Sequence, residues 1–211
     1  MRPSIEVHDA LAGLLSYPGP GLAERARAAA AVVGAECPSA GACLEDFAAR
    51  IADLDAGALE ELYAATFDNS QERALEVGWH VFGENYTRGA FLVRMRGLLR
   101  ECGVTESGEL PDHLHHVLAA LGRCDEDYAG RLAHASVIPA ARRVLEALRA
   151  DENAWAPVLA AVVEVLGRHA DAPWQAHSLD PAEVLPPLPP RPGPDDSPSC
   201  PAEHPQGMRC S

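Results

Sequence analysis

The fold of this chain is decided around the stretch Trp79-His80-Val81-Phe82-Gly83-Glu84-Asn85-Tyr86-Thr87-Arg88-Gly89. Four residues with large side chains share one helical face, because they follow an i, i+4, i+7, i+11 spacing: Leu75, Trp79, Phe82 and Tyr86. Gly83 interrupts that face, and Asn85 is a suitable N-cap. The sequence therefore predicts a helix that ends near Phe82, a kink at Gly83-Glu84, and a second helix from about Asn85. Two interpretations stay open: the aromatic residues belong to the core, or they line a concave and partly polar surface.

Apolar residues at helical spacing continue on both sides of this stretch. Helices are expected at residues 5–16, 22–34, 43–54, 56–67, 86–102, 111–121, 126–135, 139–150 and 154–166. Pro111 and Pro139 suit first turns of helices, whereas Gly34 and Gly103 suit helix ends. No strand-like alternation of useful length and no internal repeat interrupts the pattern. The sequence predicts an all-α, single-domain bundle of nine or ten helices over residues 1–170.

Composition narrows the choice of partners. The 211 residues carry a formal net charge of −14, and all 17 basic residues are arginine. This charge argues against binding to a nucleic-acid backbone, and it suits either solubility or a basic partner. The N-terminus has no apolar run long enough for a signal peptide or a membrane span, so we expect a cytoplasmic protein without membrane insertion. We also expect a monomer or a weak dimer.

Residues 171–211 differ sharply in composition, with eleven of the 18 prolines. Few large apolar residues remain there to offset the entropy of ordering, so a disordered, Pro-rich tail is expected. The run Pro186-Pro187-Leu188-Pro189-Pro190-Arg191 also fits a ligand for an aromatic groove. This leaves a second class open, a helical adaptor or scaffold that acts through its tail.

Three motifs occur in a fixed order: Tyr63-x-x-x-Phe67-Asp68, then Leu75…Trp79…Phe82-Gly83-Glu84-x-x-x-Arg88-Gly89, then Glu109-Leu110-Pro111-Asp112-His113-Leu114. Their order and spacing resemble the NarJ/TorD/DmsD family of assembly chaperones for molybdenum enzymes. The resemblance covers about residues 10–165 and is closest to the nitrate reductase assembly (NarJ-like) branch. Where that branch often has Tyr after the third motif's Asp, this chain has His113, as in the TorD/DmsD branch.

The resemblance implies a cytoplasmic, all-helical binding protein and not an enzyme, with no cofactor of its own. Its partner would be the catalytic subunit of a molybdopterin oxidoreductase, held by an N-terminal segment until the molybdenum cofactor is inserted. The aromatic side chains would supply apolar pockets for that segment, and the carboxylates would meet its basic side chains. The residues expected to bind the client peptide are Tyr63, Trp79, Phe82, Glu84, Tyr86, Arg88, Asp112 and His113.

Each polar residue in this set also has a simpler interpretation. Asp112 suits the first turn of a helix that begins at Pro111, and Arg88 lies four residues after Glu84, so the two suit a surface ion pair. No phosphate-binding glycine loop, nucleophile elbow or zincin pattern supports catalysis.

Metal binding is not predicted. His113, His115 and His116 cluster beside Asp112, but no Cys or Glu at ligand spacing completes a closed site, and positions 112, 115 and 116 share a face that 113 does not. In the tail, Cys200, His204 and Cys210 lack a scaffold. Cys102 and Cys124, near predicted helix ends, suit small apolar residues in a reducing compartment.

Overall fold

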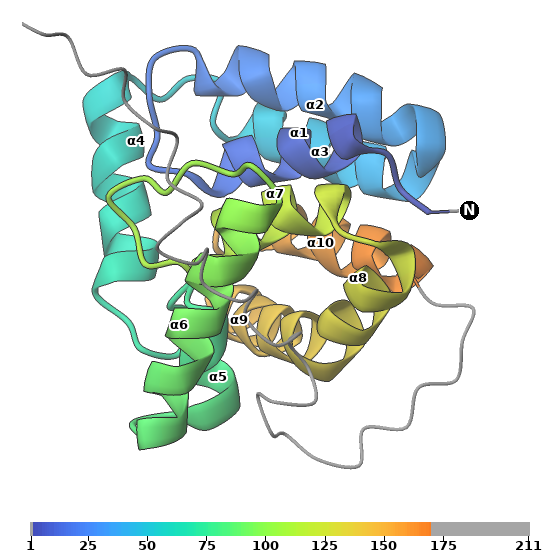
Figure 1. The fold of residues 1–211 in the computed structure, drawn as a ribbon. Helices are drawn as coiled ribbons and strands as arrows, with labels where there is room; N and C mark the ends of the chain where they lie inside the picture. The colour runs from blue at the N-terminus through green and yellow to red at the C-terminus, as the bar shows by residue number, and fades with distance from the viewer. Residues whose placement is uncertain (1, 170–211) are drawn as a thin grey trace, which may run out of the picture.

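The computed structural model describes residues 2–169, and over this range the protein is all-α (Figure 1). The predicted fold class is confirmed, because this part of the chain forms helices and no strand. The α-helices are α1 Ile5–Leu15, α2 Leu22–Glu36, α3 Pro38–Arg50, α4 Ala56–Tyr63, α5 Val77–Phe82, α6 Tyr86–Glu101, α7 Leu114–Arg123, α8 Glu126–Leu132, α9 Ile138–Ala150 and α10 Ala156–Leu166. The Pro-rich tail, with its adaptor motif and its Cys and His residues, lies outside the described residues.

The helices α1, α2 and α3 form one layer, shown in blue at the top of Figure 1, and α8, α9 and α10 lie beneath it. The helices α2 and α3 approach closely at Gly34 and Gly41. A Cβ added to Gly41 would lie 2.5 Å from the Cα of Gly34 and 2.9 Å from the carbonyl oxygen of Ala30. Glycine is therefore required at Gly41, since any side chain would separate the two helices.

The centre of the core is Trp155, which is fully buried at the start of α10. Its ring lies 4.7 Å from that of Phe47, and 5.5 Å from each of the rings of Tyr63 and Phe67. The hydroxyl of Tyr63 donates to the carbonyl oxygen of Leu15 at 3.0 Å, which ties α4 to the end of α1. The first motif is therefore a core element, because Tyr63 and Phe67 both belong to this cluster.

The predicted start of the helix at 43–54 is wrong, and proline explains the difference. The helix expected at 43–54 begins earlier, at Pro38, because proline is tolerated at the first helical position. The helices expected at 126–135 and 139–150 are α8 and α9, with Pro139 in the first turn of α9 as predicted, and a π-helical segment, Ala133–Val137, joins them. Pro139 has no N–H for the helical ladder, and the π segment in the turn before it lets α9 follow α8 without a break.

The predicted kink is confirmed. The helix α5 ends at Phe82, and Gly83 has φ 60° and ψ −148°, a conformation that side chains disfavour. Asn85 caps α6, because its side-chain oxygen accepts the N–H of Thr87 at 3.1 Å. Leu75 precedes α5 and Tyr86 follows the kink, so the four residues do not share one continuous helical face.

Among the residues that the structure describes, no helix combines the length and the apolar character needed to cross a membrane.

Candidate functional site

Two segments far apart in sequence pair just before α5 and α7. The N–H of Val77 donates to the carbonyl oxygen of Asp112 at 3.0 Å, and the N–H of Leu114 donates to that of Leu75 at 2.8 Å. Together they make one antiparallel bridge, between Glu76 and His113. This bridge joins the second and third sequence motifs, whose proximity the sequence alone did not reveal.

Asp112 lies beneath this bridge and not at a rim. Its side chain is fully buried, and Oδ2 accepts the N–H of Gly78 at 2.9 Å. Burial raises the pKa of the Asp112 carboxyl, opposed by the Gly78 hydrogen bond and by the charge of Arg88. The prediction that Asp112 lies in the first turn of a helix that begins at Pro111 is wrong, because α7 begins at Leu114. Asp112 is a buried acceptor that holds the start of α5.

Gly78 makes that burial possible. A Cβ added to Gly78 would lie 2.7 Å from Oδ2 of Asp112 and 2.9 Å from Cδ1 of Phe91. A real Cβ atom essentially never makes contacts this short. The carboxylate can therefore reach the backbone N–H only because residue 78 has no side chain.

His113 is the N-cap of α7 and one wall of a pocket. Its side chain is 3% exposed, and its Nδ1 accepts the N–H of His115 at 3.3 Å. Burial, together with the neighbouring His115 and His116, lowers the pKa of His113 to about 3. Its ring is therefore neutral at physiological pH.

His116 uses both ring nitrogens within the protein. Nε2 accepts the N–H of Ser107 at 2.9 Å, and Nδ1 donates to the carbonyl oxygen of Leu110 at 2.9 Å. Within residues 2–169, no group of three or more His, Cys, Asp or Glu side chains is arranged to hold a metal ion. The histidine cluster instead fixes the loop between α6 and α7.

The bridge forms one wall of a pocket of about 300 Å³, which we call the acidic pocket. It is lined by Phe67, Asp68, Ser70, Gln71, Ala74, Leu75, Glu76, Glu109 and His113. Three carboxylates from separate segments therefore surround an apolar floor made by Phe67 and Leu75. The pKa of Tyr63 is raised first by burial and then by the charges of these three carboxylates, so their field reaches the buried phenol.

The aromatic residues at the kink form a different surface. Trp79 is half-buried, and its Nε1 donates to the carbonyl oxygen of Gln71 at 3.0 Å. The ring of Phe82 packs 5.3 Å from that of Phe91, whereas Tyr86 is 95% exposed. Sequence analysis left open whether these residues belong to the core or the surface, and the structure divides them between the two.

Trp79 also lines a cleft of about 520 Å³, which we call the aromatic cleft. Its lining residues are Gln71, Glu72, Trp79, His80, Gly83, Arg143, Glu146 and Ala147. Because Gln71 lines both the acidic pocket and the aromatic cleft, the two hollows lie on either side of one short segment.

The predicted ion pair between Glu84 and Arg88 is not formed. No ion pair joins these two described residues, and Glu84 is exposed. The guanidinium of Arg88 instead lies over the ring of Trp79, 5.5 Å from its centroid. The kink at Gly83 turns α6 away from α5, so a spacing of four residues does not place these side chains together.

The structure therefore divides the eight predicted residues into two groups. Tyr63, Asp112 and His113 are buried around the acidic pocket, and the others lie at or near the kink: Trp79, Phe82, Glu84, Tyr86 and Arg88. Sequence analysis missed the carboxylates Asp68, Glu76 and Glu109 as site residues. Asp68 and Glu109 are residues of the first and third sequence motifs, so the motifs could have identified them as site residues. Glu76 is not a motif residue, and nothing in the sequence marked it.

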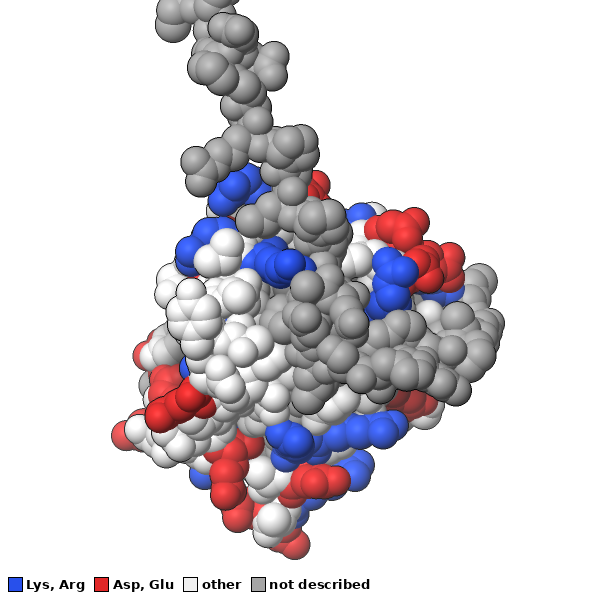
Figure 2. Space-filling model, turned by 60° about the horizontal axis from the view of Figure 1, so that its bottom comes forward, with Lys and Arg blue, Asp and Glu red and all other residues white. Residues whose placement is uncertain are grey.

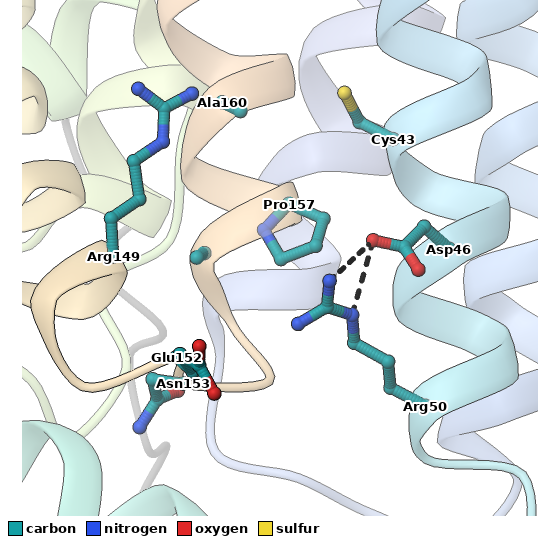
Figure 3. Close-up of a pocket in the computed structure, with 9 residues that line it drawn as sticks. Cys43, Asp46, Arg50, Arg149, Glu152, Asn153, Pro157 and Ala160 are labelled. Carbon is teal, nitrogen blue, oxygen red and sulfur yellow. Dashed lines mark hydrogen bonds and ion pairs between the residues drawn. The ribbon is translucent and has the colours of Figure 1, made fainter.

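A further cleft of about 510 Å³ lies between α3 and the α9–α10 connection (Figure 3). Arg50 pairs there with Asp46 at 2.9 Å, and Arg149 extends from the end of α9. None of the eight predicted residues lines this cleft. Its charges are of both signs and partly paired, so its lining differs from that of the acidic pocket.

The fold and this pocket define an all-helical protein with an acidic hollow lined by residues from three sequence motifs. The family model for the nitrate reductase delta subunit matches residues 33–161, more than half of the chain. The chain therefore belongs to the nitrate reductase delta subunit family, a family of assembly chaperones for molybdoenzymes and not of enzymes. The family acts with molybdoenzyme catalytic subunits. No curated protein matches the chain.

Proposed function

We propose that this protein is a cytoplasmic chaperone of the nitrate reductase assembly (NarJ-like) branch. It binds the N-terminal segment of the catalytic subunit of a nitrate reductase-like molybdopterin oxidoreductase. It holds that apoprotein for molybdenum cofactor insertion and complex assembly. The observation that carries this proposal is the acidic pocket, because the motifs that mark the family converge on it.

The acidic pocket suits an arginine or lysine side chain from a client peptide. Phe67 and Leu75 offer an apolar floor for the methylene groups, while the carboxylates of Asp68, Glu76 and Glu109 accept the charged end. Arginine suits the site better than lysine, because its planar guanidinium can donate to two carboxylates at once.

Local carboxylates matter here more than the overall charge. Figure 2 shows acidic and basic side chains interspersed on the lower face of the molecule, although the chain as a whole carries a net charge of −14. Among the described residues, this face therefore has no single continuous acidic patch. Recognition of a basic segment therefore depends on the pocket, where three carboxylates come together without a basic lining residue.

The aromatic cleft extends the site for apolar residues of the same peptide. Trp79 and Gly83 line it, Phe82 packs on Phe91 beside the kink, and the exposed Glu84 and Tyr86 follow Gly83 in the chain. Arg88 holds the Trp79 ring from one side. A peptide that crosses Gln71 reaches both hollows.

The buried residues of the predicted set act from beneath the acidic pocket. Asp112 fixes the start of α5 through Gly78, and His113 presents one ring surface to the pocket. Tyr63 supports the floor through its packing on Phe67, with ring centroids 5.0 Å apart. These residues shape the site without meeting the peptide's charge.

Titration of a synthetic peptide tests this proposal. The probe is a dye-labelled peptide with two adjacent arginines among leucines, measured against the wild type and Glu76→Gln. Loss of one charge-assisted contact is expected to weaken binding about tenfold and to reduce its salt dependence. The matched control is Glu45→Gln, an exposed α3 residue that lines neither hollow, which should bind like the wild type. Equal binding by the two variants would exclude the acidic pocket as the cation site.

A further inference from the structure

Two thiols meet where α6 and α7 end. Cys102 is the C-cap of α6 and Cys124 is the C-cap of α7, and their Sγ atoms lie 3.4 Å apart. A disulfide needs an S–S distance of about 2.05 Å, so the two sulfur atoms must approach by about 1.4 Å. Both residues follow the last helical turn, where a side chain can rotate without disturbing the helical ladder. The pair is therefore positioned for bond formation with little rearrangement.

The two thiols are not equivalent. Cys102 is partly exposed, whereas Cys124 is 8% exposed. The hydrogen bond from the Cys124 thiol lowers the pKa of Cys102, and Arg123 also lowers it, against the effects of burial and Glu101. The pKa of Cys124 is raised by the same hydrogen bond and by burial. Cys102 is thus the accessible nucleophile, and Cys124 is a buried thiol in contact with it.

The other described thiols lack this arrangement. The Cys37 thiol donates to a carboxylate oxygen of Glu164 at 3.2 Å and contacts no second thiol among the described residues. Burial, followed by the charge of Glu164, raises the pKa of Cys43. Within residues 2–169, Cys102 and Cys124 form the one pair of thiols in hydrogen-bond contact.

We propose that Cys102 and Cys124 form a redox-modification site, at which an oxidant of the peroxide class converts the two thiols into a disulfide. The Cys102 thiolate attacks one peroxide oxygen, the O–O bond breaks, and the departing oxygen takes up a proton. With hydrogen peroxide the products are a sulfenic acid on Cys102 and one water. The Cys124 sulfur then attacks the Cys102 sulfur, the S–O bond breaks, and the hydroxyl leaves as a second water with the Cys124 proton. The two thiols lose two electrons in total, and a dithiol reductant restores them.

The disulfide would close the chain segment from Cys102 to Cys124. This segment holds the loop with Glu109 and His113, which Figure 1 shows reaching from α6 toward α4 before it returns to α7. Arg2 already ties the end of α7 down, since its guanidinium donates to the carbonyl oxygen of Cys124 at 2.6 Å. A covalent bond would restrict the unfolded chain at the same place, and so stabilise the fold.

Peptide mapping tests the site directly on the full chain. Trypsin releases Cys102 in residues 101–123 and Cys124 in residues 124–131, while Cys37 and Cys43 share residues 28–50. After treatment of the reduced protein with hydrogen peroxide, we expect 101–123 linked to 124–131, with a mass about 2 Da below the sum of the two peptides. The proposal would be overturned if this linked species did not form, or if it formed no faster than Cys37 and Cys43 are oxidised in peptide 28–50.

Two variants test the order of attack and the effect on the fold. In Cys124→Ser, Cys102 should accumulate sulfenic acid that dimedone traps on 101–123, and in Cys102→Ser no peptide should be trapped at Cys124. Oxidised wild type should melt roughly 5–10 °C higher than reduced protein, and both variants should show no such rise. Linkage of 101–123 to the peptide with Cys200, or dimedone on Cys124 in preference to Cys102, would refute the assignment.

Discussion

Replacement of Gly78 by alanine should destabilise the protein strongly. The added Cβ would lie 2.7 Å from Oδ2 of Asp112 and 2.9 Å from Cδ1 of Phe91, and neither group can move without cost. Overpacking of a buried site costs about 1–3 kcal/mol. If Asp112 retreats, the hydrogen bond from the Gly78 N–H at 2.9 Å is also lost, which costs a further ~1.5 kcal/mol or more. The expected loss is therefore about 2–5 kcal/mol of the free energy of unfolding.

Urea denaturation at neutral pH, followed by circular dichroism, measures this loss. The matched control is Gly89→Ala on α6, where an added Cβ meets nothing within 4 Å. That substitution should be neutral or should stabilise by up to about 1 kcal/mol, because alanine favours helix. The double variant Gly78→Ala with Asp112→Ala should recover part of the loss, since the nearest clash is gone. A Gly78→Ala variant within about 0.5 kcal/mol of the wild type would refute the account of the buried contact.

Further predictions concern pH, charge, the aromatic surface and the tail. Burial lowers the pKa of His113 from 6.5 to about 3, so the stability that its neutral ring contributes should be complete above pH 6.5 and should fall as the pH decreases toward 3. In His113→Asn, which can still cap α7, the free energy of unfolding measured by urea titration should fall less steeply over this pH range. Burial raises the pKa of Asp112, so the stability of the wild type should fall as the pH rises above the ordinary Asp pKa, and Asp112→Asn should abolish this fall. The same variant should leave the salt dependence of peptide binding unchanged. A reduced salt dependence would make Asp112 a direct charge partner of the peptide. Tyr86→Ala should preserve the melting temperature, because Tyr86 is 95% exposed, yet weaken peptide binding severalfold; unchanged affinity would remove Tyr86 from the site. Deletion of residues 175–211 should leave client maturation intact, and failure of maturation would instead favour an adaptor that acts through the tail.

Local sequence was sufficient for the helical framework. Apolar spacing identified α1 and α10 nearly to the residue, and Gly83 with Asn85 located the kink between α5 and α6. These features depend on neighbours a few residues apart, through helical periodicity, glycine conformation and capping. Proline was informative at Pro139, which lies in the first turn of α9 as predicted, but not at Pro38, which begins a helix that was expected to start at residue 43.

The sequence also determined the family, since its motifs keep their order along the chain, and the nitrate reductase delta subunit model matches over residues 33–161. It did not determine which motif residues face solvent. Asp112 had the pattern of an exposed helix start, but pairing of residues 75–77 with 112–114 draws it under Gly78 and buries it. Glu76 had no motif signal and becomes a pocket wall through the same pairing. Burial and the meeting of carboxylates depend on contacts between segments more than thirty residues apart, and these exist only once the helices have packed.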